Sequence, residues 1–350
     1  MQTRRVLSLF VVLAWVASFA PALLAQNNQP KRTKQEQQDI EALQKLLDGV
    51  AAGTTPAPTE IPVTWQHNIF VAAAEGATYV PFTVRVDRSA LSSPGVALYV
   101  RAVSKDAAAA PAPEQGNNRD RNNRNNQQEF PWQQVYFLDV PANGVIERPL
   151  ALKPGNYDVF VAVKERTPER QQRNAPPLKS GVVRHELSVP NFGPGSDLTT
   201  STVMTATTIE PLSAPLTQEQ QTDEPYLSAF GARLVQPEDG KFKKTGDFNV
   251  FFWIYGAGQE GGKPNLTIEY SFHQKTAEGE KYFNKTTPQE VNAQTLPPAF
   301  DMNQGHQIPG STGVPLASFP EGDYRLEIKI TDKTSGKTLT QNANFTVVAG

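Results

Sequence analysis

The stretch Pro320-Glu-Gly-Asp-Tyr-Arg-Leu-Glu-Ile-Lys-Ile-Thr-Asp332 decides the expected fold, because apolar and polar residues alternate along it. One side of the alternation carries Tyr324, Leu326, Ile328 and Ile330. The other side carries charged and polar residues, so the period of two predicts a strand with one buried and one solvated face. A strand of this kind belongs to an antiparallel sheet that packs its apolar face on a core.

The same pattern occurs a second time in Lys153-Pro-Gly-Asn-Tyr-Asp-Val-Phe-Val-Ala-Val-Lys-Glu165, which aligns on the first stretch without gaps. Each copy opens with Gly-Asn-Tyr or Gly-Asp-Tyr. A tyrosine at this place is typical of the tyrosine corner of immunoglobulin-like sandwiches, where the phenol bonds back to the backbone. We therefore predict structural roles for Tyr157 and Tyr324, with a ligand contact as the alternative for both.

Further strands are expected around the two copies, each bounded by Pro, Gly, Asn or Asp. They cover residues 80–86, 96–103, 134–138, 144–150, 156–164, 182–189, 230–235, 248–255, 266–273, 281–283, 313–316, 323–331 and 338–347. Short strands separated by frequent turns predict an all-β chain with two tandem immunoglobulin-like antiparallel β-sandwiches, at 60–190 and 225–350. Residues 191–224, rich in Thr, Ser, Pro and Gln, are expected to be a linker with one possible strand at 202–209. Residues 105–129, rich in Asn and Arg, are expected to be a disordered insertion.

The first 25 residues have the pattern of a secretory signal peptide, with Arg4 and Arg5 before an apolar run that ends at Ala20. An uncleaved anchor is the alternative. Residues 26–59 form a polar segment, in which 34–50 predict a short amphipathic helix with Ile40, Leu43, Leu47 and Val50 on one stripe. This helix either packs on a neighbouring domain or associates with a copy of itself. We expect export to the periplasm or cell surface, and no transmembrane helix after signal cleavage.

The composition excludes several classes of function. The chain has no cysteine, which excludes disulfide frameworks, thiolate metal sites and cysteine nucleophiles. Its 33 basic and 35 acidic residues are balanced, so charge gives no argument for nucleic-acid binding.

The motif search finds no catalytic, cofactor or metal site. His67, His185, His273 and His306 lack the spacing of a zinc site. His185 and His273 lie at the ends of expected strands, so edge or loop-facing positions are expected for these two. Residues 301–305 weakly resemble the opening of a calcium loop, and a polar turn is the preferred interpretation. An active site made of carboxylates alone is invisible at this level, since it depends on separation in space.

Aromatic residues are the candidates for a contact surface. The run Phe251-Phe-Trp-Ile-Tyr255 is aromatic on both faces of one expected strand, so one face must lie away from the core. We name Trp132, Trp253 and Tyr255 as a possible contact surface. Packing between domains and binding of a ligand or partner are the two interpretations of this surface.

Three phrases carry a resemblance to a known group of proteins: Tyr79-Val-Pro-Phe-Thr-Val84, Val96-Ala-Leu-Tyr-Val-Arg101, and the stretch from Pro320 to Lys337. They resemble uncharacterised secreted proteins of acidobacterial type, over roughly residues 60–190 and 225–348. In that group, immunoglobulin-like modules with similar sequences occur alone or beside von Willebrand A-type or GWxTD domains. This chain contains neither the Gly-Trp-x-Thr-Asp motif nor the Asp-x-Ser-x-Ser motif that mark these two kinds of domain. The resemblance implies a fold and a compartment, and it supplies no catalytic residues.

The expected function is therefore that of an exported, non-enzymatic protein-interaction or structural module of the cell envelope, with protein or envelope components as partners. A carbohydrate- or small-ligand-binding β-sandwich is the alternative. Nothing in the sequence sets the oligomeric state.

Overall fold

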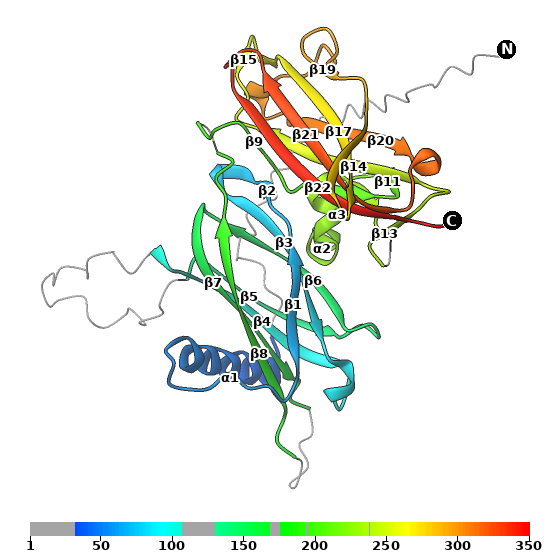
Figure 1. Cartoon of the computed structure of the whole chain (residues 1–350). Coiled ribbons are helices and arrows are strands. Elements are labelled where there is room, and N and C mark those ends of the chain that lie inside the picture. The colour runs from blue at the N-terminus through cyan, green and yellow to red at the C-terminus, as the bar shows by residue number, and fades with distance from the viewer. Residues whose placement is uncertain (1–31, 107–129, 169–175, 194, 238) are drawn as a thin grey trace, which may run out of the picture. The chain divides into compact units, whose positions relative to one another are not determined.

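A computed structural model describes residues 32–106, 130–168, 176–193, 195–237 and 239–350 (Figure 1). The expected signal peptide and most of the expected insertion at 105–129 lie outside these ranges. The described residues form two compact units, which we call the N-terminal unit (32–193 with 216–229) and the C-terminal unit (195–215 with 230–350).

The N-terminal unit contains two four-stranded antiparallel sheets. In the first, β3 (Thr78–Val86) pairs with β1 (Val63–Asn68), β2 (Val71–Ala72) and β6 (Val145–Leu152). The second has the order β5 (Trp132–Asp139), β4 (Gly95–Ser104), β7 (Gly155–Glu165) and β8 (Ser180–Val189). Two 3₁₀ turns, η2 (Ala74–Gly76) and η3 (Arg88–Ala90), connect the strands.

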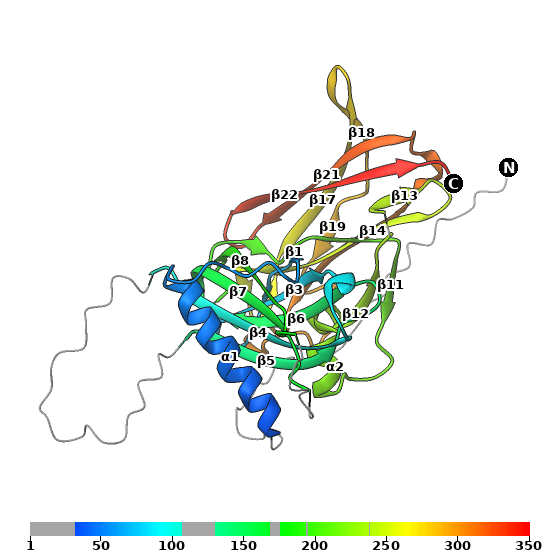
Figure 2. The same cartoon turned by 90° about the horizontal axis from the view of Figure 1, so that it is seen from below.

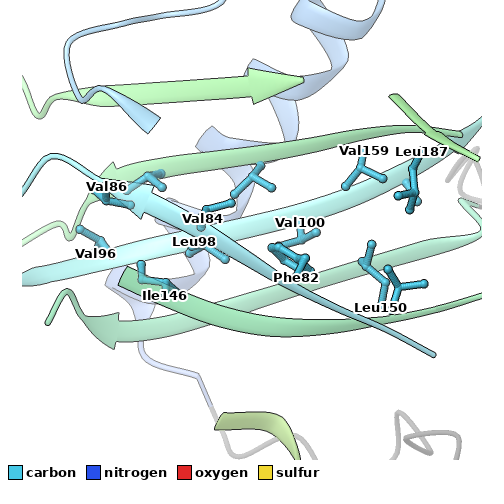
Figure 3. Close-up of a cluster of buried hydrophobic side chains, with 14 of the residues drawn as sticks. Phe82, Val84, Val86, Val96, Leu98, Val100, Ile146, Leu150, Val159 and Leu187 are labelled. Atoms are coloured by element: carbon cyan, nitrogen blue, oxygen red, sulfur yellow. The ribbon is translucent and has the colours of Figure 1, made fainter. Parts of the chain in front are cut away.

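The core of the N-terminal unit lies between these two sheets, and Figure 3 shows its side chains meeting there. The inward residues alternate along each strand, as the period of two requires. They include Phe82 and Val84 from β3, Leu98 and Val100 from β4, Ile146 and Leu150 from β6, and Val159 and Val161 from β7.

Helix α1 (Lys34–Ala51) lies across the outer face of the second sheet, over β4 and β7 (Figure 2). Thr33 begins the helix with a capping box, in which its hydroxyl accepts from Glu36 N–H and the Glu36 carboxylate accepts from Thr33 N–H. Leu43 and Leu47 are fully buried against the sheet, and burial of each contributes about 1.5–3 kcal/mol. The predicted helix is therefore present, and it packs on its own sandwich.

The buried stripe of α1 differs from the expected one in a single position. Asp39 is buried while Ile40 is half-exposed, so a charged residue occupies the inner face. The Asp39 carboxylate lies 2.5 Å from Lys164 Nζ and also accepts from the N–H and the hydroxyl of Thr167. Ile40 was expected on this face because an apolar pattern cannot anticipate a buried charge whose partner lies far along the chain.

A second helical segment belongs to the N-terminal unit, although it lies after residue 215. It consists of α2 (Gln218–Asp223) and α3 (Pro225–Phe230). Tyr226 Oη lies 2.8 Å from Thr83 Oγ1, and Tyr79 Oη donates to the Gln221 carbonyl over 3.2 Å. Thr83 and Tyr79 stand on the outer face of β3, so this segment covers the first sheet from outside.

The C-terminal unit is also built from two sheets. The first has the order β10 (Met204–Ala206), β14 (Asp247–Tyr255) and β20 (Ile308–Pro315), with β9 (Thr199–Thr200) also paired to β14. The second has the order β13 (Lys241–Lys243), β22 (Thr338–Val348), β21 (Gly322–Asp332), β17 (Leu266–Thr276) and β18 (Gly279–Lys285), with β19 (Gln289–Val291) also on β17. All these pairs are antiparallel except β13 with β22, which is parallel. The described part of the unit also contains two small antiparallel strand pairs and two 3₁₀ turns. The pairs are β11 (Thr208–Pro211) with β12 (Ala232–Val235) and β15 (Gln259–Glu260) with β16 (Lys263–Pro264), and the turns are η5 (Met302–Gln304) and η6 (Leu316–Ser318).

Aromatic rings dominate the core of the C-terminal unit. Phe248 stacks on Phe345 at 3.9 Å between ring centroids, and Tyr324 stacks on Phe345 at 5.2 Å. Phe272 and Phe319 complete the group with edge-to-face contacts. The inward phase of the repeated strand places Tyr324 in this cluster, as its alternation predicts.

The all-β class and the antiparallel sandwich architecture predicted from the alternation are confirmed. Residues 191–224 differ from the expected linker, since they contain β9, β10, β11 and α2. Their Thr- and Pro-rich composition indicated loops, yet short pairs with β14 and β12 order them. Among the described residues, no helix is both long and apolar enough to cross a membrane.

Candidate functional site

The two predicted tyrosine-corner residues make the same hydrogen bond in their two units. Tyr324 Oη donates to the Pro320 carbonyl over 2.7 Å, and Tyr157 Oη donates to the Lys153 carbonyl over 2.9 Å. In each case the acceptor lies four residues upstream, so the phenol closes the turn that leads into the strand. Both tyrosines are buried, and burial raises the pKa of each phenol above its ordinary value. These are the hydrogen bonds to the backbone that a tyrosine corner makes.

Glycine is required two residues before each of these tyrosines. Gly155 has a φ of 150° and Gly322 a φ of 136°, which side-chain-bearing residues rarely adopt. At Gly155 a Cβ would also come within 3.0 Å of Asp106 Oδ2. The turn of each corner therefore depends on its glycine.

Each repeated strand also ends on a buried carboxylate, which the sequence analysis did not single out. Glu165 Oε1 accepts from Ser92 N–H (2.7 Å), and Glu165 Oε2 accepts from Lys179 N–H (3.0 Å). Ser92 lies in the turn before β4 and Lys179 in the segment before β8. The carboxylate therefore ties three parts of the N-terminal unit together.

Asp332 does the same in the C-terminal unit. Its carboxylate accepts from Gly258 N–H (2.7 Å), Thr334 N–H (3.0 Å), Ser335 N–H (3.3 Å) and the Ser335 hydroxyl (2.5 Å). Burial raises the pKa of Asp332 and of Glu165, but the hydrogen bonds outweigh burial and hold both pKa values below the ordinary range. The sequence could have indicated that Glu165 and Asp332 are buried, because both lie on the inward-facing positions of the repeated strand.

The three aromatic residues named as a possible contact surface lie on two strands, one in each unit. Trp132 begins β5 in the N-terminal unit and packs partly against its core. Trp253 and Tyr255 lie on β14 in the C-terminal unit, where Phe251 meets Trp253 edge-to-face at 5.0 Å and Tyr255 is buried. Among the described residues, Tyr282 on β18 is the large aromatic residue that is strongly exposed, with 59% of its surface accessible. Sequence reasoning missed it because a short polar strand gave no reason to select it.

The four histidines all make local contacts. His185 stacks on Trp65 at 4.3 Å, and His67 lies 5.4 Å from the Tyr226 ring. His273 lies 6.0 Å from the Tyr282 ring. Across the described ranges, no group of three or more His, Asp or Glu side chains is arranged to hold a metal ion.

The loop at 301–305 is a turn closed by its own side chains. Asp301 Oδ1 accepts from Asn303 N–H over 2.9 Å, and His306 Nδ1 accepts from Asp301 N–H over 2.9 Å. The ammonium group of Lys263 binds the preceding loop by donating to the carbonyls of Pro297, Pro298 and Phe300. The oxygens that suggested calcium are thus engaged in a polar turn.

One hollow of about 310 Å³ lies on the N-terminal unit between the β5–β6 hairpin and α2. Glu147, Arg148 and Asp223 line it, together with Leu138, Asp139, Pro141, Asn143, Val145 and Ile146. Arg148 spans the hollow from a Tyr136 ring to the Asp223 carboxylate, 3.2 Å from its NH2. Burial, followed by the nearby Glu224 carboxylate, raises the pKa of Glu147. Arg148 is thus engaged within the lining, since its NH2 group pairs with Asp223 and its NH1 group donates to the Glu147 carbonyl.

Comparison with known proteins gives only distant likenesses. No protein-family profile matches the chain, and no curated protein matches it in sequence. The trypsin-activated alpha-2-macroglobulin of Escherichia coli is 10% identical over 84% of this chain and 17% of its own, with a TM-score of 0.25. A DUF4785 family protein of Legionella pneumophila is 10% identical over 78% and 53%, with a TM-score of 0.23. A Salmonella alpha-2-macroglobulin mutant is 13% identical over 83% and 17%, with a TM-score of 0.20.

The chain therefore spans about a sixth to a half of the length of these structures. At such TM-scores the likenesses carry no argument about function, and the site has to be interpreted from its own chemistry.

Proposed function

We propose that this chain is an exported, non-enzymatic protein-interaction or structural module of the cell envelope. The observation that carries the proposal is that, in both units, buried polar side chains form hydrogen bonds with the backbone. The buried carboxylates of Glu165 and Asp332 and the phenols of Tyr157 and Tyr324 all bond to the backbone of neighbouring turns. Groups fixed in this way hold a scaffold, and the same arrangement is repeated in the two sandwiches.

Export is supported by the basic and apolar order of residues 1–25, which has the pattern of a secretory signal. The absence of cysteine is compatible with an oxidising compartment, because no thiol is exposed to oxidation there. Partners are then proteins or other components of the envelope.

The test is photo-crosslinking of a tagged chain in its native envelope, followed by identification of the captured molecules. We expect one or a few proteins to be enriched over a tagged, unrelated exported sandwich. Capture at the level of that control would contradict the proposed function. Cell fractionation of the same strain tests export, since the tag must then leave the cytoplasm.

A second candidate function, binding of a carbohydrate, is favoured by one observation. The exposed ring of Tyr282 stands on the outer face of the second C-terminal sheet, near the Arg325 guanidinium that binds Glu280 (2.9 Å) and Asn342 (2.6 Å). An exposed ring beside fixed donors and acceptors suits a sugar. A glycan panel that binds the wild type but not Tyr282→Ala would support this function, and equal binding or none would remove it.

A further inference from the structure

Strand β5 is an edge strand whose outer side is unpaired. It stands at the end of the sheet order β5-β4-β7-β8 and pairs with β4 from Trp132↔Ala102 to Asp139↔Gly95. Within the described ranges, none of its backbone groups bonds to another residue on the far side. An exposed edge of this kind offers a row of N–H and C=O groups to an incoming strand.

Three other sheet edges, at β8, β18 and β13, are protected. The segment before β1 covers β8, since Ile61 N–H donates to the Ser180 carbonyl and Val182 N–H donates to the Pro58 carbonyl. Strand β18 carries Glu280, Lys281 and Lys285 within seven residues, and β13 is three residues long with a lysine at each end. Charges and short length are the devices that prevent edge pairing.

Strand β5 lacks these devices from Trp132 to Leu138, and its one charged residue, Asp139, stands at its end. Its sequence Trp132-Gln-Gln-Val-Tyr-Phe-Leu138 contains no charge, no proline and no glycine. Val135 and Phe137 face α1, whereas Trp132, Tyr136 and Leu138 face the core. Three cations lie over aromatic rings of this strand, Arg32 and Arg166 over Phe137 and Arg148 over Tyr136, and these rings stand on the faces of the sheet. Aromatic and β-branched residues without charge have high strand-pairing propensity.

We propose that β5 pairs antiparallel with β5 of a second copy of this chain, about a two-fold axis, so that the two sheets become one continuous sheet. The argument for a second copy is self-complementarity, because a two-fold contact places the same strand on both sides. With the axis at Val135, Trp132 stands opposite Leu138 and Gln133 opposite Phe137. All these pairs are neutral, and Asp139 lies beyond the partner strand. No like charges oppose one another.

This inference rests on the proposed function, because it names one partner and one surface for an interaction module. Its failure can be distinguished from failure of that function. A monomeric protein that still captures other envelope proteins would overturn the pairing of β5 and leave the interaction function standing.

The first measurement is the mass of the purified chain in solution by sedimentation over a wide range of concentration. We expect a concentration-dependent dimer. Val135→Lys places two ammonium groups opposite each other and is expected to weaken self-association by about tenfold or more. Val135→Thr, which keeps the branched shape without charge, is the matched control and should still dimerise. A wild type that stays monomeric, or an unchanged Val135→Lys, would overturn the proposal.

The second measurement uses the absence of native cysteine. A single cysteine introduced in turn at positions 133 to 137 should form an intermolecular disulfide fastest at the residue on the axis, since opposed Cβ atoms there come close enough to bridge. Asn284→Cys on the charged edge β18 is the control and should crosslink slowly. These variants add no charge, so they test the pairing even where Val135→Lys perturbs folding. Equal rates at β5 and at β18 would overturn it.

Discussion

Glu165 and Asp332 stand at the same position of the repeated strand, and both turn a buried carboxylate toward backbone N–H groups. Glu165 accepts from the turn before β4, and Asp332 from Gly258 in the loop before β17. Strands β4 and β17 are the neighbours of β7 and β21 in their sheets. Each sandwich thus has a tyrosine bond at one end of the repeated strand and a carboxylate at the other.

Asp332→Asn tests the carboxylate end. The amide keeps one acceptor oxygen and loses the negative charge. Its NH₂ group replaces the second oxygen, so it cannot accept the hydrogen bonds that the carboxylate receives there. Hydrogen bonds to charged groups contribute about 1.5–3 kcal/mol, so we expect a loss of roughly 2 kcal/mol in the free energy of unfolding, measured with urea. Asp323→Asn, on the same strand and bonded only to the Thr346 hydroxyl, is the control and should change little. Equal losses in both would contradict the assignment.

The pH dependence of stability follows from the same groups. The folded pKa values of Glu165 and Asp332 lie below their ordinary values of 4.5 and 3.8, so the unfolded chain takes up protons first on acidification. Stability is therefore complete above the ordinary values and is lost as the pH falls through the folded ones. Urea midpoints measured against pH should decline in this acid range. Asp332→Asn should flatten the decline, and an identical slope would argue that other carboxylates cause it.

Tyr324→Phe tests the other end of the strand. The substitution removes the bond to the Pro320 carbonyl and keeps the ring in its stack on Phe345. We expect a loss of roughly 1 kcal/mol, the net contribution of one hydrogen bond. Tyr157→Phe should lose a similar amount, since its bond has the same form. Melting curves report both, and an unchanged curve for either variant would remove the structural role of that phenol.

Asp39→Ala tests the attachment of α1. The Asp39 carboxylate and Lys164 are both largely buried, so removal of the acid leaves an unpaired ammonium group under the helix. Breaking a buried pair in this way costs about 3–5 kcal/mol. Glu41→Ala on the exposed side of α1 is the control. Protease cleavage within α1 should become faster in Asp39→Ala alone. Equal cleavage of wild type and Asp39→Ala would show that the ion pair does not hold the helix.

The strands could be predicted because alternation is a local property. Tyr324, Leu326, Ile328 and Ile330 were placed on a core face from their spacing alone, and they are buried. Helix α1 was found for a similar reason, since Leu43 and Leu47 keep one stripe. In both cases the solvated face of the element is visible in the sequence as the residues between the apolar ones.

Other features depend on partners that are distant along the chain. The burial of Asp39 is stabilised by Lys164, and no window around residue 39 contains that lysine. Tyr226 packs on Thr83 of the N-terminal unit, although the sequence analysis placed residue 226 at the start of the second sandwich. Glu165 and Asp332 end the two aligned stretches, so their equivalence could be found from the sequence. Their role could not, because it depends on loops that donate hydrogen bonds to them from other parts of the chain. Trp132 and Trp253 were named as aromatic residues of a possible contact surface, and both are half-buried, because exposure is set by what packs around a residue rather than by its type.

His185 carries the last prediction, since it stacks on Trp65 at 4.3 Å while Trp65 stacks on Phe82 at 4.7 Å. Because Trp65 lies on β1 and His185 on β8, the stack bridges the two sheets of the N-terminal unit. Burial lowers the pKa of His185 below its ordinary 6.5, although the Glu186 carboxylate opposes this shift. The folded unit therefore favours the neutral imidazole.

The sign of the effect follows from this depressed pKa. On acidification the unfolded chain takes up the proton at the ordinary value, and the folded chain does so only at a lower pH. Stability is thus present above the ordinary pKa and is lost as the pH falls through and below it. Burial lowers the pKa of His67 in the same direction, so the wild type has two contributors. His185→Phe keeps an aromatic ring in the stack and removes one of them. Urea midpoints between about pH 8 and pH 5 should decline less steeply in this variant than in the wild type. Equal slopes would mean that the imidazole on Trp65 titrates alike in the folded and unfolded chains.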